Sequence, residues 1–139
     1  MRFDLLEGEE VAVPSVADVL WLHDNVALIE GGMPGVLDEG ALASALARPM
    51  HVAAYSDEDP DLVLLAAYLW HGVSEGHAFV DANKRTAVLT MIAFLASNGI
   101  AFDTEEREVG LFVDAAYKRD LFAVKWLEDY LRSRCHWIE

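Results

Sequence analysis

Two apolar segments, residues 62–70 and 86–96, constrain the fold more than any other feature of the sequence. The first is apolar at nearly every position, and within the second only Thr90 interrupts the run from Ala87 onward. A helix that is apolar on nearly every side is buried rather than placed at the surface. Both segments fall short of the roughly 20 residues that a membrane span needs. The sequence therefore predicts two central helices, joined by the polar stretch between them.

The segments before these two helices carry signals for covering helices. Ser15 can cap a helix that ends at Gly31, because short polar side chains favour N-caps and glycine favours the left-handed C-terminal stop. Asp38 can cap a shorter helix over residues 39–47, and Pro49 is expected to end it.

The rest of the chain completes the prediction of an all-α protein. Asp59–Pro60 is a strong start for the first central helix, Thr104 can cap a later helix, and a last helix is expected over residues 121–134. Residues 50–58 lack a helical period, so an extended flap and a plain loop remain alternatives there. We expect a bundle of about six helices forming a single domain over residues 1–139.

Composition limits the classes of partner. The net charge is −14, from 24 acidic residues against 10 Lys and Arg. Binding to a phosphate backbone needs clustered cations, so we do not expect direct nucleic-acid binding. The single cysteine, Cys135, cannot form an internal disulfide, and the acidic N-terminal residues do not form a secretory signal. These features predict a cytoplasmic protein without a membrane anchor.

The polar stretch between the central helices reads His-Ala-Phe-Val-Asp-Ala-Asn-Lys-Arg, residues 77–85. A structural turn needs only one capping residue, and Asp81 or Asn83 would suffice. The N-terminus of the following helix presents unpaired N–H groups and the positive end of its dipole. Lys84 and Arg85 add two positive charges beside it. The combination predicts an anion site suited to phosphate.

Two further side chains of this stretch suggest a reaction. The imidazole of His77 can act as a base and take a proton from an incoming hydroxyl. The carboxylate of Asp81 is a hard ligand that can hold Mg²⁺ against phosphates. Phosphoryl transfer asks a protein mainly for positioning and charge neutralisation. Phe79, between the two, is expected to point into the core and pin the loop.

A competing interpretation rests on His23 and Asp24, which form the doublet found in helical metal-dependent phosphohydrolases. That class needs a further histidine upstream, and no histidine precedes His23 in this sequence. We therefore prefer the interpretation based on residues 77–85.

The stretch 77–85 resembles the signature of the Fic/Doc superfamily, specifically its Doc (death-on-curing) branch. Broader Fic proteins carry His-Pro-Phe-x-(Asp/Glu)-Gly-Asn-Gly-Arg there, whereas this chain has Ala82 and Lys84 in place of the glycines and Ala78 in place of the proline. Doc-like proteins carry Asp-Ala-Asn-Lys-Arg-Thr. The similarity extends across residues 23–24, 35–40, 45–49 and 98–99, and so covers most of the chain.

This resemblance implies a Fic-type helical bundle and a bacterial toxin of a toxin–antitoxin pair. Doc-like toxins use Mg-ATP as kinases, phosphorylating a threonine of elongation factor Tu and stopping translation. By resemblance, His77 is the general base on the target hydroxyl, and Asp81 helps to bind magnesium and to orient the target. Asn83, Lys84 and Arg85 hold the phosphates. A cognate, Phd-like antitoxin is the implied partner.

Two alternatives remain open at this point. An enzyme of the same fold can transfer AMP instead of phosphate, and a domain that has lost activity can serve as a binding or regulatory module. The lysine at position 84 occupies space and adds charge where a glycine leaves room, so it can change which phosphate faces His77. Many Fic enzymes also carry a built-in inhibitory glutamate, but residues 104–109 are more simply a capped helix start.

Overall fold

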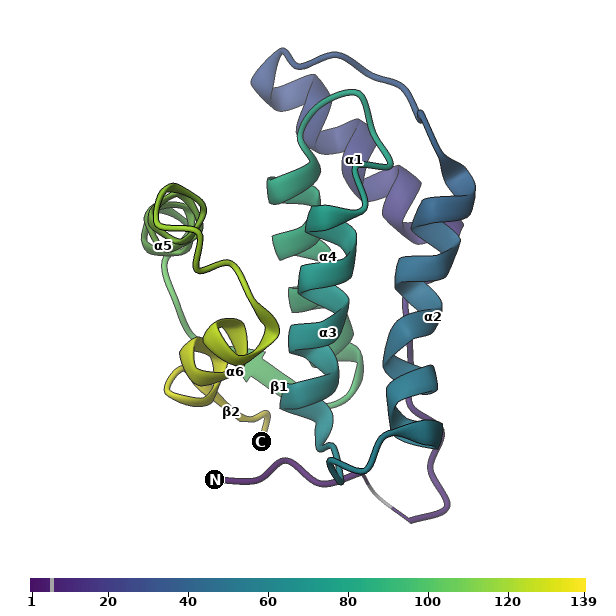
Figure 1. The fold of residues 1–139 in the computed structure, drawn as a ribbon, viewed down its shortest axis with the longest axis vertical. Coiled ribbons are helices and arrows are strands. Elements are labelled where there is room, and N and C mark those ends of the chain that lie inside the picture. Colours follow the sequence, from purple (N-terminus) through teal and green to yellow (C-terminus); the bar gives the residue numbers. More distant parts are fainter. Residues whose placement is uncertain (6) are drawn as a thin grey trace.

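The structure is a computed structural model that describes residues 1–5 and 7–139 (Figure 1). In chain order its elements are α1 (Val16–Glu30), α2 (Glu39–Tyr55), α3 (Leu62–Glu75), α4 (Asn83–Ser97), β1 (Ile100–Phe102), α5 (Glu106–Lys118), α6 (Val124–Arg132) and β2 (Cys135–Trp137). The described residues thus form six helices and one two-stranded antiparallel sheet. The prediction of an all-α, Fic-type bundle is confirmed.

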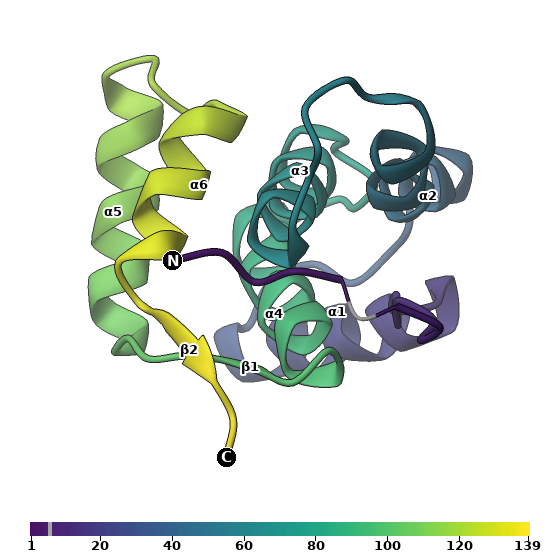
Figure 2. The ribbon, with the colours of Figure 1, turned by 90° about the horizontal axis from the view of Figure 1, so that it is seen from below.

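Helices α3 and α4 are the predicted central pair, and they lie side by side in both ribbon views (Figures 1 and 2). On α3, Val63, Leu65 and Trp70 are completely buried, and on α4 Met91 and Phe94 are also completely buried. Burying one large apolar side chain contributes about 1.5–3 kcal/mol. The two apolar runs therefore form the centre of the hydrophobic core.

The other helices cover this pair from two sides. Helix α1 packs against α4 and α2 packs against α3, while α6 packs against α3 from the opposite side (Figure 2). Helix α5 lies further out, beside α6. The short strands β1 and β2 pair with Ile100 opposite Trp137 and Phe102 opposite Cys135. No helix of residues 1–5 and 7–139 combines the length and apolarity that crossing a bilayer requires.

The prediction for residues 39–58 is wrong in two respects. Helix α2 does not end at Pro49 but continues through it to Tyr55, so residues 50–55 are neither a flap nor a loop. Proline inside a helix removes one hydrogen bond and costs about 3 kcal/mol. Pro49 is buried here, together with Ala45 and Leu46 of the same helix, and this packing offsets the cost. A sequence pattern, whether helical periodicity or a proline expected to end a helix, does not show this packing.

The caps agree with the sequence for the first two helices and differ for two later ones. Ser15 forms a capping box with Asp18, and Asp38 accepts a hydrogen bond from the N–H of Ala41. Helix α3 is capped by Asp61 rather than by Asp59, because only the Asp61 carboxylate reaches the N–H of Leu64. At the start of α5, Thr104 donates its hydroxyl hydrogen to the carbonyl of Asp103 instead of capping the helix.

Candidate active site

The polar loop, residues 77–82, joins α3 to α4 at the end of the bundle that is uppermost in Figure 1. His77 and Ala82, at its two ends, have φ angles of 48° and 62°. A non-glycine residue in this left-handed region costs about 1–3 kcal/mol. The surrounding structure must therefore hold the loop in a shape that it would not adopt alone.

One contact that holds the loop is a buried aromatic stack. Phe79 is 1% exposed and its ring lies on that of His23, with centroids 3.9 Å apart and planes 7° apart. The Nε2–H of His23 donates to the carbonyl of Asp81 at 2.9 Å. The prediction that Phe79 pins the loop is confirmed. His23 is itself 1% exposed, so it supports the loop from the protein interior.

The side chain of Asn83 closes the loop on itself. Its Oδ1 accepts a hydrogen bond from the N–H of Phe79 at 3.1 Å, and its Nδ2 donates to the carbonyl of Phe79 at 3.0 Å. Both polar ends of the amide are thus engaged with one backbone unit. In this state Asn83 fixes the geometry of the loop, and its predicted contact with phosphate would have to be made in addition to these bonds.

The loop is also joined by its backbone to the segment between α1 and α2. The N–H of Leu37 donates to the carbonyl of Ala78 at 2.7 Å, and the N–H of Val80 donates to the carbonyl of Gly35 at 3.2 Å. Gly35 has a φ angle of 132°, and a Cβ there would lie 3.3 Å from Cγ2 of Val80. This position therefore requires glycine.

The predicted site residues lie around one concavity of about 410 Å³. It is lined by Ser74, His77, Val80, Asp81, Ala82, Asn83, Lys84, Arg85 and Tyr117. The imidazole of His77 is not packed inward, because its side chain is 73% exposed. Its Nε2 lies 4.0 Å from a carboxylate oxygen of Glu75. The fold thus brings every predicted site residue to one hollow, with an accessible imidazole among them.

Asp81 is placed at the surface of this concavity. Its Oδ1 accepts a hydrogen bond from the N–H of Ala82 at 2.8 Å, and a Cβ at Gly32 would lie 3.3 Å from its Oδ2. Within residues 1–5 and 7–139, no cluster of three or more His, Cys, Asp or Glu side chains could hold a metal. A magnesium ion at Asp81 would thus need nucleotide phosphates and water as its other ligands, which is usual for this ion.

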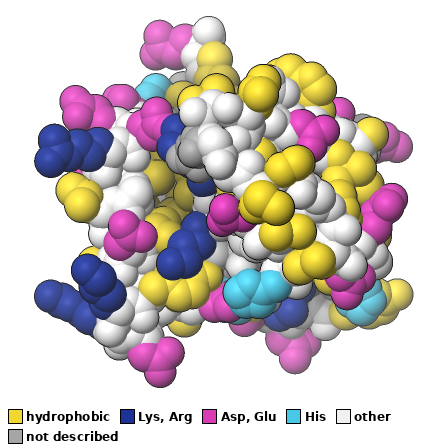
Figure 3. All heavy atoms as spheres, turned by 90° about the horizontal axis from the view of Figure 1, so that it is seen from above, with side chains coloured by type: hydrophobic (Ala, Val, Ile, Leu, Met, Phe, Trp, Pro, Cys, Tyr) yellow, Lys and Arg dark blue, Asp and Glu magenta, His cyan; other side chains and the backbone are white. Residues whose placement is uncertain are grey.

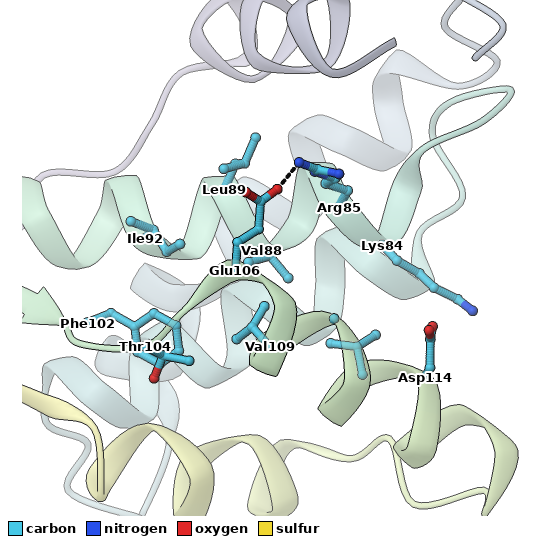
Figure 4. A pocket seen from close by; sticks show the side chains of 12 residues that line it. Lys84, Arg85, Val88, Leu89, Ile92, Phe102, Thr104, Glu106, Val109 and Asp114 are labelled. Carbon is cyan, nitrogen blue, oxygen red and sulfur yellow. Dashed lines mark ion pairs between the residues drawn. The ribbon is translucent and has the colours of Figure 1, made fainter. Parts of the chain in front are cut away.

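The first turn of α4 supplies the positive charge. Ala82, the N-cap, has no side-chain acceptor, so its side chain leaves the N–H groups of the first turn for another acceptor. Lys84 extends over the ring of Tyr117, with Nζ 4.2 Å from the ring centroid. Arg85 pairs with Glu106 at the start of α5. Figure 4 shows both cations at the edge of a neighbouring cavity of about 330 Å³ between α4 and α5.

Three residues of this region were missed at the level of sequence. Ser74 lies 3 positions before His77, whereas Glu106 and Tyr117 lie 29 and 40 positions after it. No motif captures these spacings. Glu106 belongs to the segment interpreted only as a helix start, and it contacts a predicted phosphate ligand. For Tyr117 no local sequence signal exists, because only the packing of α5 brings it to α4.

Side chains on this end of the molecule are unevenly distributed. In Figure 3 the basic side chains gather over α5 and the centre of the face, whereas hydrophobic side chains gather on the side of α1 and α2. Several large apolar residues are exposed around the loop, which we call the apolar rim: Leu28, Ile29, Met33, Leu37 and Val80. Large apolar side chains that gather on one exposed face are typical of surfaces that contact another protein.

Comparison with known proteins agrees with this arrangement. The Fic/DOC family matches residues 14–95, which is more than half of the chain. The chain belongs to the Fic/DOC family. Protein kinase doc of Escherichia phage P1 is 37% identical over 93 residues, 66% of this chain and 73% of that protein. Toxin Doc of Mycolicibacterium smegmatis is 39% identical over 82 residues, 56% of this chain and 63% of that protein.

The geometry explains one feature of the Fic/DOC motif. Broader Fic motifs carry glycine at the position of Ala82, and the φ angle of 62° here is one that glycine adopts without strain. The family match ends at residue 95, so the residues of α5 that contact Lys84 and Arg85 lie outside it. Membership of the Fic/DOC family therefore accounts for the loop but not for the side of the site formed by α5.

Proposed function

We propose that this chain is a Doc-like toxin of a toxin–antitoxin pair that transfers a phosphoryl group from ATP to a protein hydroxyl. The observation that carries the proposal is the placement of an accessible imidazole and two cations around one concavity at a helix N-terminus. The names of the two relatives, a protein kinase and a toxin, support the same choice.

In the proposed reaction His77 acts as general base. Its imidazole takes the proton of the acceptor hydroxyl, and the hydroxyl oxygen forms a bond to the γ-phosphorus. The bond between that phosphorus and the oxygen bridging to the β-phosphate breaks, and ADP leaves. General-base catalysis of this kind contributes about 10²–10⁴-fold to a rate. The exposure of His77 supports this role, since an acceptor can reach it from solvent.

The phosphates would be held by the first turn of α4 together with Lys84 and Arg85. Backbone N–H groups and two cations offer hydrogen-bond donors and positive charge to a chain of negatively charged phosphates. Asp81 would hold Mg²⁺, which would neutralise charge between the phosphates. Asn83 would act mainly by keeping the loop closed, since its amide bonds the backbone of Phe79.

The acceptor is proposed to be a threonine of elongation factor Tu, by similarity to Doc-like toxins. The apolar rim beside the loop favours a protein rather than a small molecule as acceptor. The partner that would restrain the toxin is a Phd-like antitoxin, for which a short amphipathic helix laid in a groove is a common mode of binding.

The decisive experiment incubates the purified protein with elongation factor Tu and Mg²⁺ and either γ-labelled or α-labelled ATP. Label is expected in the acceptor only from the γ position. Transfer from only the α position would replace the kinase proposal with AMP transfer.

The matched variants are His77→Ala and His51→Ala. Both replace an exposed histidine, but His51 lies on α2 and is not among the residues of the concavity. His77→Ala is expected to lower the transfer rate by about 10²–10⁴-fold, whereas His51→Ala keeps it. Growth arrest that survives His77→Ala would show that the chain acts as a binding module instead.

A further inference from the structure

We infer that the aromatic ring of Tyr117 is a positioning group that holds the ammonium of Lys84 at the phosphate site. The inference rests on the proposed function and adds to it a residue outside the segment that matches the family. It concerns the one cation of the motif that replaces a glycine of broader Fic proteins.

The contact itself is direct. Nζ of Lys84 lies 4.2 Å from the centroid of the Tyr117 ring, within the distance at which a cation is attracted to an aromatic face. Both residues line the concavity that also contains His77. A lysine side chain is long and flexible, so without such a contact its ammonium would sample many positions in solvent.

An aromatic ring suits this task better than a carboxylate would. A carboxylate would occupy N–H donors of the ammonium and cancel its charge, and it would compete with phosphate. A ring attracts the ammonium through its electron-rich face and leaves the donors on the other side for an anion. Lys84 can therefore be held in place and still carry its full charge into the site.

Tyr117 is itself firmly held. Its hydroxyl forms a 2.7 Å hydrogen bond with Oγ of Ser74, which is 1% exposed. Its ring stacks on Phe122 with centroids 4.4 Å apart, and Phe122 stacks in turn on His71. Burial raises the pKa of the Tyr117 phenol, so the hydroxyl stays protonated in this contact. The ring is therefore fixed from α3 and from the segment after α5.

One neighbouring group offers a competing explanation. Asp114, one turn before Tyr117 on α5, lines the adjacent cavity, and in Figure 4 the Lys84 side chain points toward it. If Asp114 determined the position of Lys84, removal of the Tyr117 ring would leave the ammonium in place and would change the KM for ATP little. The experiment must separate these two groups.

The first measurement is NMR of the full chain with ¹³C-methylated lysines. The lysines of the sequence are Lys84, Lys118 and Lys125, and the Lys84→Arg variant assigns the signal of interest. A ring 4.2 Å away shifts the Lys84 methyl resonance upfield. Tyr117→Leu is expected to abolish this shift, whereas Tyr117→Phe keeps the ring and most of the shift. Loss of the shift in Asp114→Asn, which leaves the ring in place, would overturn the inference, because it would show that the carboxylate and not the ring holds the ammonium there.

The second measurement is the KM for ATP. Tyr117→Leu is expected to raise it by about 2- to 30-fold, the range that a cation–π contact represents. Adding Tyr117→Leu to Lys84→Met should raise KM no further, since the ring acts through the lysine. Tyr55→Leu, which removes a tyrosine 77% exposed on α2, is the control and should change neither readout.

The two measurements fail in different ways. A wild-type protein that transfers no label would refute the proposed function, while a Lys84 shift that persists in Asp114→Asn would still support the positioning. An unchanged KM in Tyr117→Leu, or additive effects in the double variant, would overturn the role of the ring toward phosphate. If Tyr117→Leu melts at a lower temperature than the wild type, its effects could come from lost stability, and the Tyr117→Phe variant then decides whether the ring or the hydroxyl holds Lys84. A shift lost there would show that the hydroxyl, not the ring, holds Lys84.

Discussion

The two ends of the central helix α3 differ in how their polar groups are used. At its N-terminus, Asp61 is 1% exposed and its carboxylate accepts hydrogen bonds from Phe3, Leu64 and Arg132. At its C-terminus lies the polar loop, which has left-handed residues at both ends and is followed directly by the exposed cations Lys84 and Arg85. The polar groups at the N-terminal end are paired within the chain, whereas those at the C-terminal end can bind an anion from solvent.

This difference separates two tasks: the N-terminal end of α3 stabilises the fold, and the C-terminal end carries the candidate active site. The guanidinium of Arg132 bonds both carboxylate oxygens of Asp61 at 2.9 Å, and Glu128 contacts the same guanidinium. Burial alone would raise the pKa of Asp61, but the hydrogen bonds from Arg132, Phe3 and Leu64 hold it below its usual range. The clamped end therefore supplies rigidity to the helix pair that presents the loop.

The largest expected effect comes from breaking the clamp. Arg132→Met leaves the buried Asp61 charge without its partner, which typically costs about 3–5 kcal/mol. We expect this loss in the free energy of unfolding measured with urea, with phosphate transfer per folded molecule unchanged. A loss below about 1 kcal/mol would show that the two ends do not differ in this way.

The same clamp gives the stability a definite pH dependence. The pKa of Asp61 is depressed in the folded protein, so the stability it contributes is fully present above its unfolded pKa of about 3.9. That contribution is lost as the pH falls through the folded pKa. Asp61→Asn should remove this part of the acid sensitivity, and an unchanged acid profile in that variant would assign the sensitivity elsewhere.

A smaller effect is expected at the strained end. Ala82→Gly removes the cost of a left-handed alanine, about 1–3 kcal/mol, and adds the entropy cost of glycine, about 0.5–1 kcal/mol. The variant should therefore be more stable by about 1 kcal/mol, measured by urea unfolding. Ala78→Gly, whose residue has no positive φ, is the control and should be less stable than the wild type. A destabilising Ala82→Gly would show that the loop is not strained.

The smallest effect concerns the carboxylate that faces Arg85. Glu106 is 74% exposed, and exposed ion pairs are worth about 0.2–1 kcal/mol. Glu106→Gln removes a competitor for phosphate and should tighten binding of ADP by up to about 5-fold in calorimetry. Glu105→Gln removes the same charge one residue earlier as a control. Equal effects of the two variants would point to overall charge rather than to this contact.

The sequence was sufficient for the parts of the molecule that are encoded locally. The apolar runs predicted α3 and α4, and the polar stretch between them predicted residues that the fold gathers at one concavity. Ser15 and Gly31 marked the ends of α1 correctly. In each case the signal lies within a few residues of the structure it determines.

The remaining parts depend on contacts between distant segments. Strands β1 and β2 have three residues each, too few for an alternating pattern. They pair with each other although α5 and α6 lie between them in the sequence. The continuation of α2 through Pro49 depends on burial of that proline. The contact between Tyr117 and Lys84 depends on the packing of α5. Such features follow from tertiary structure, which local patterns do not contain.

The joining of the polar loop to residues 35–38 has a consequence for how this site can diverge in sequence. Its hydrogen bonds run between backbone groups of Leu37 and Ala78 and of Val80 and Gly35. Backbone pairing does not depend on which side chain is present, so substitutions such as alanine for proline at position 78 leave these bonds available. Of the four residues in these bonds, only Gly35, with its φ of 132°, is tied to one amino acid. The part of the loop's shape that rests on these backbone bonds can thus be kept while the side chains at positions 37, 78 and 80 change.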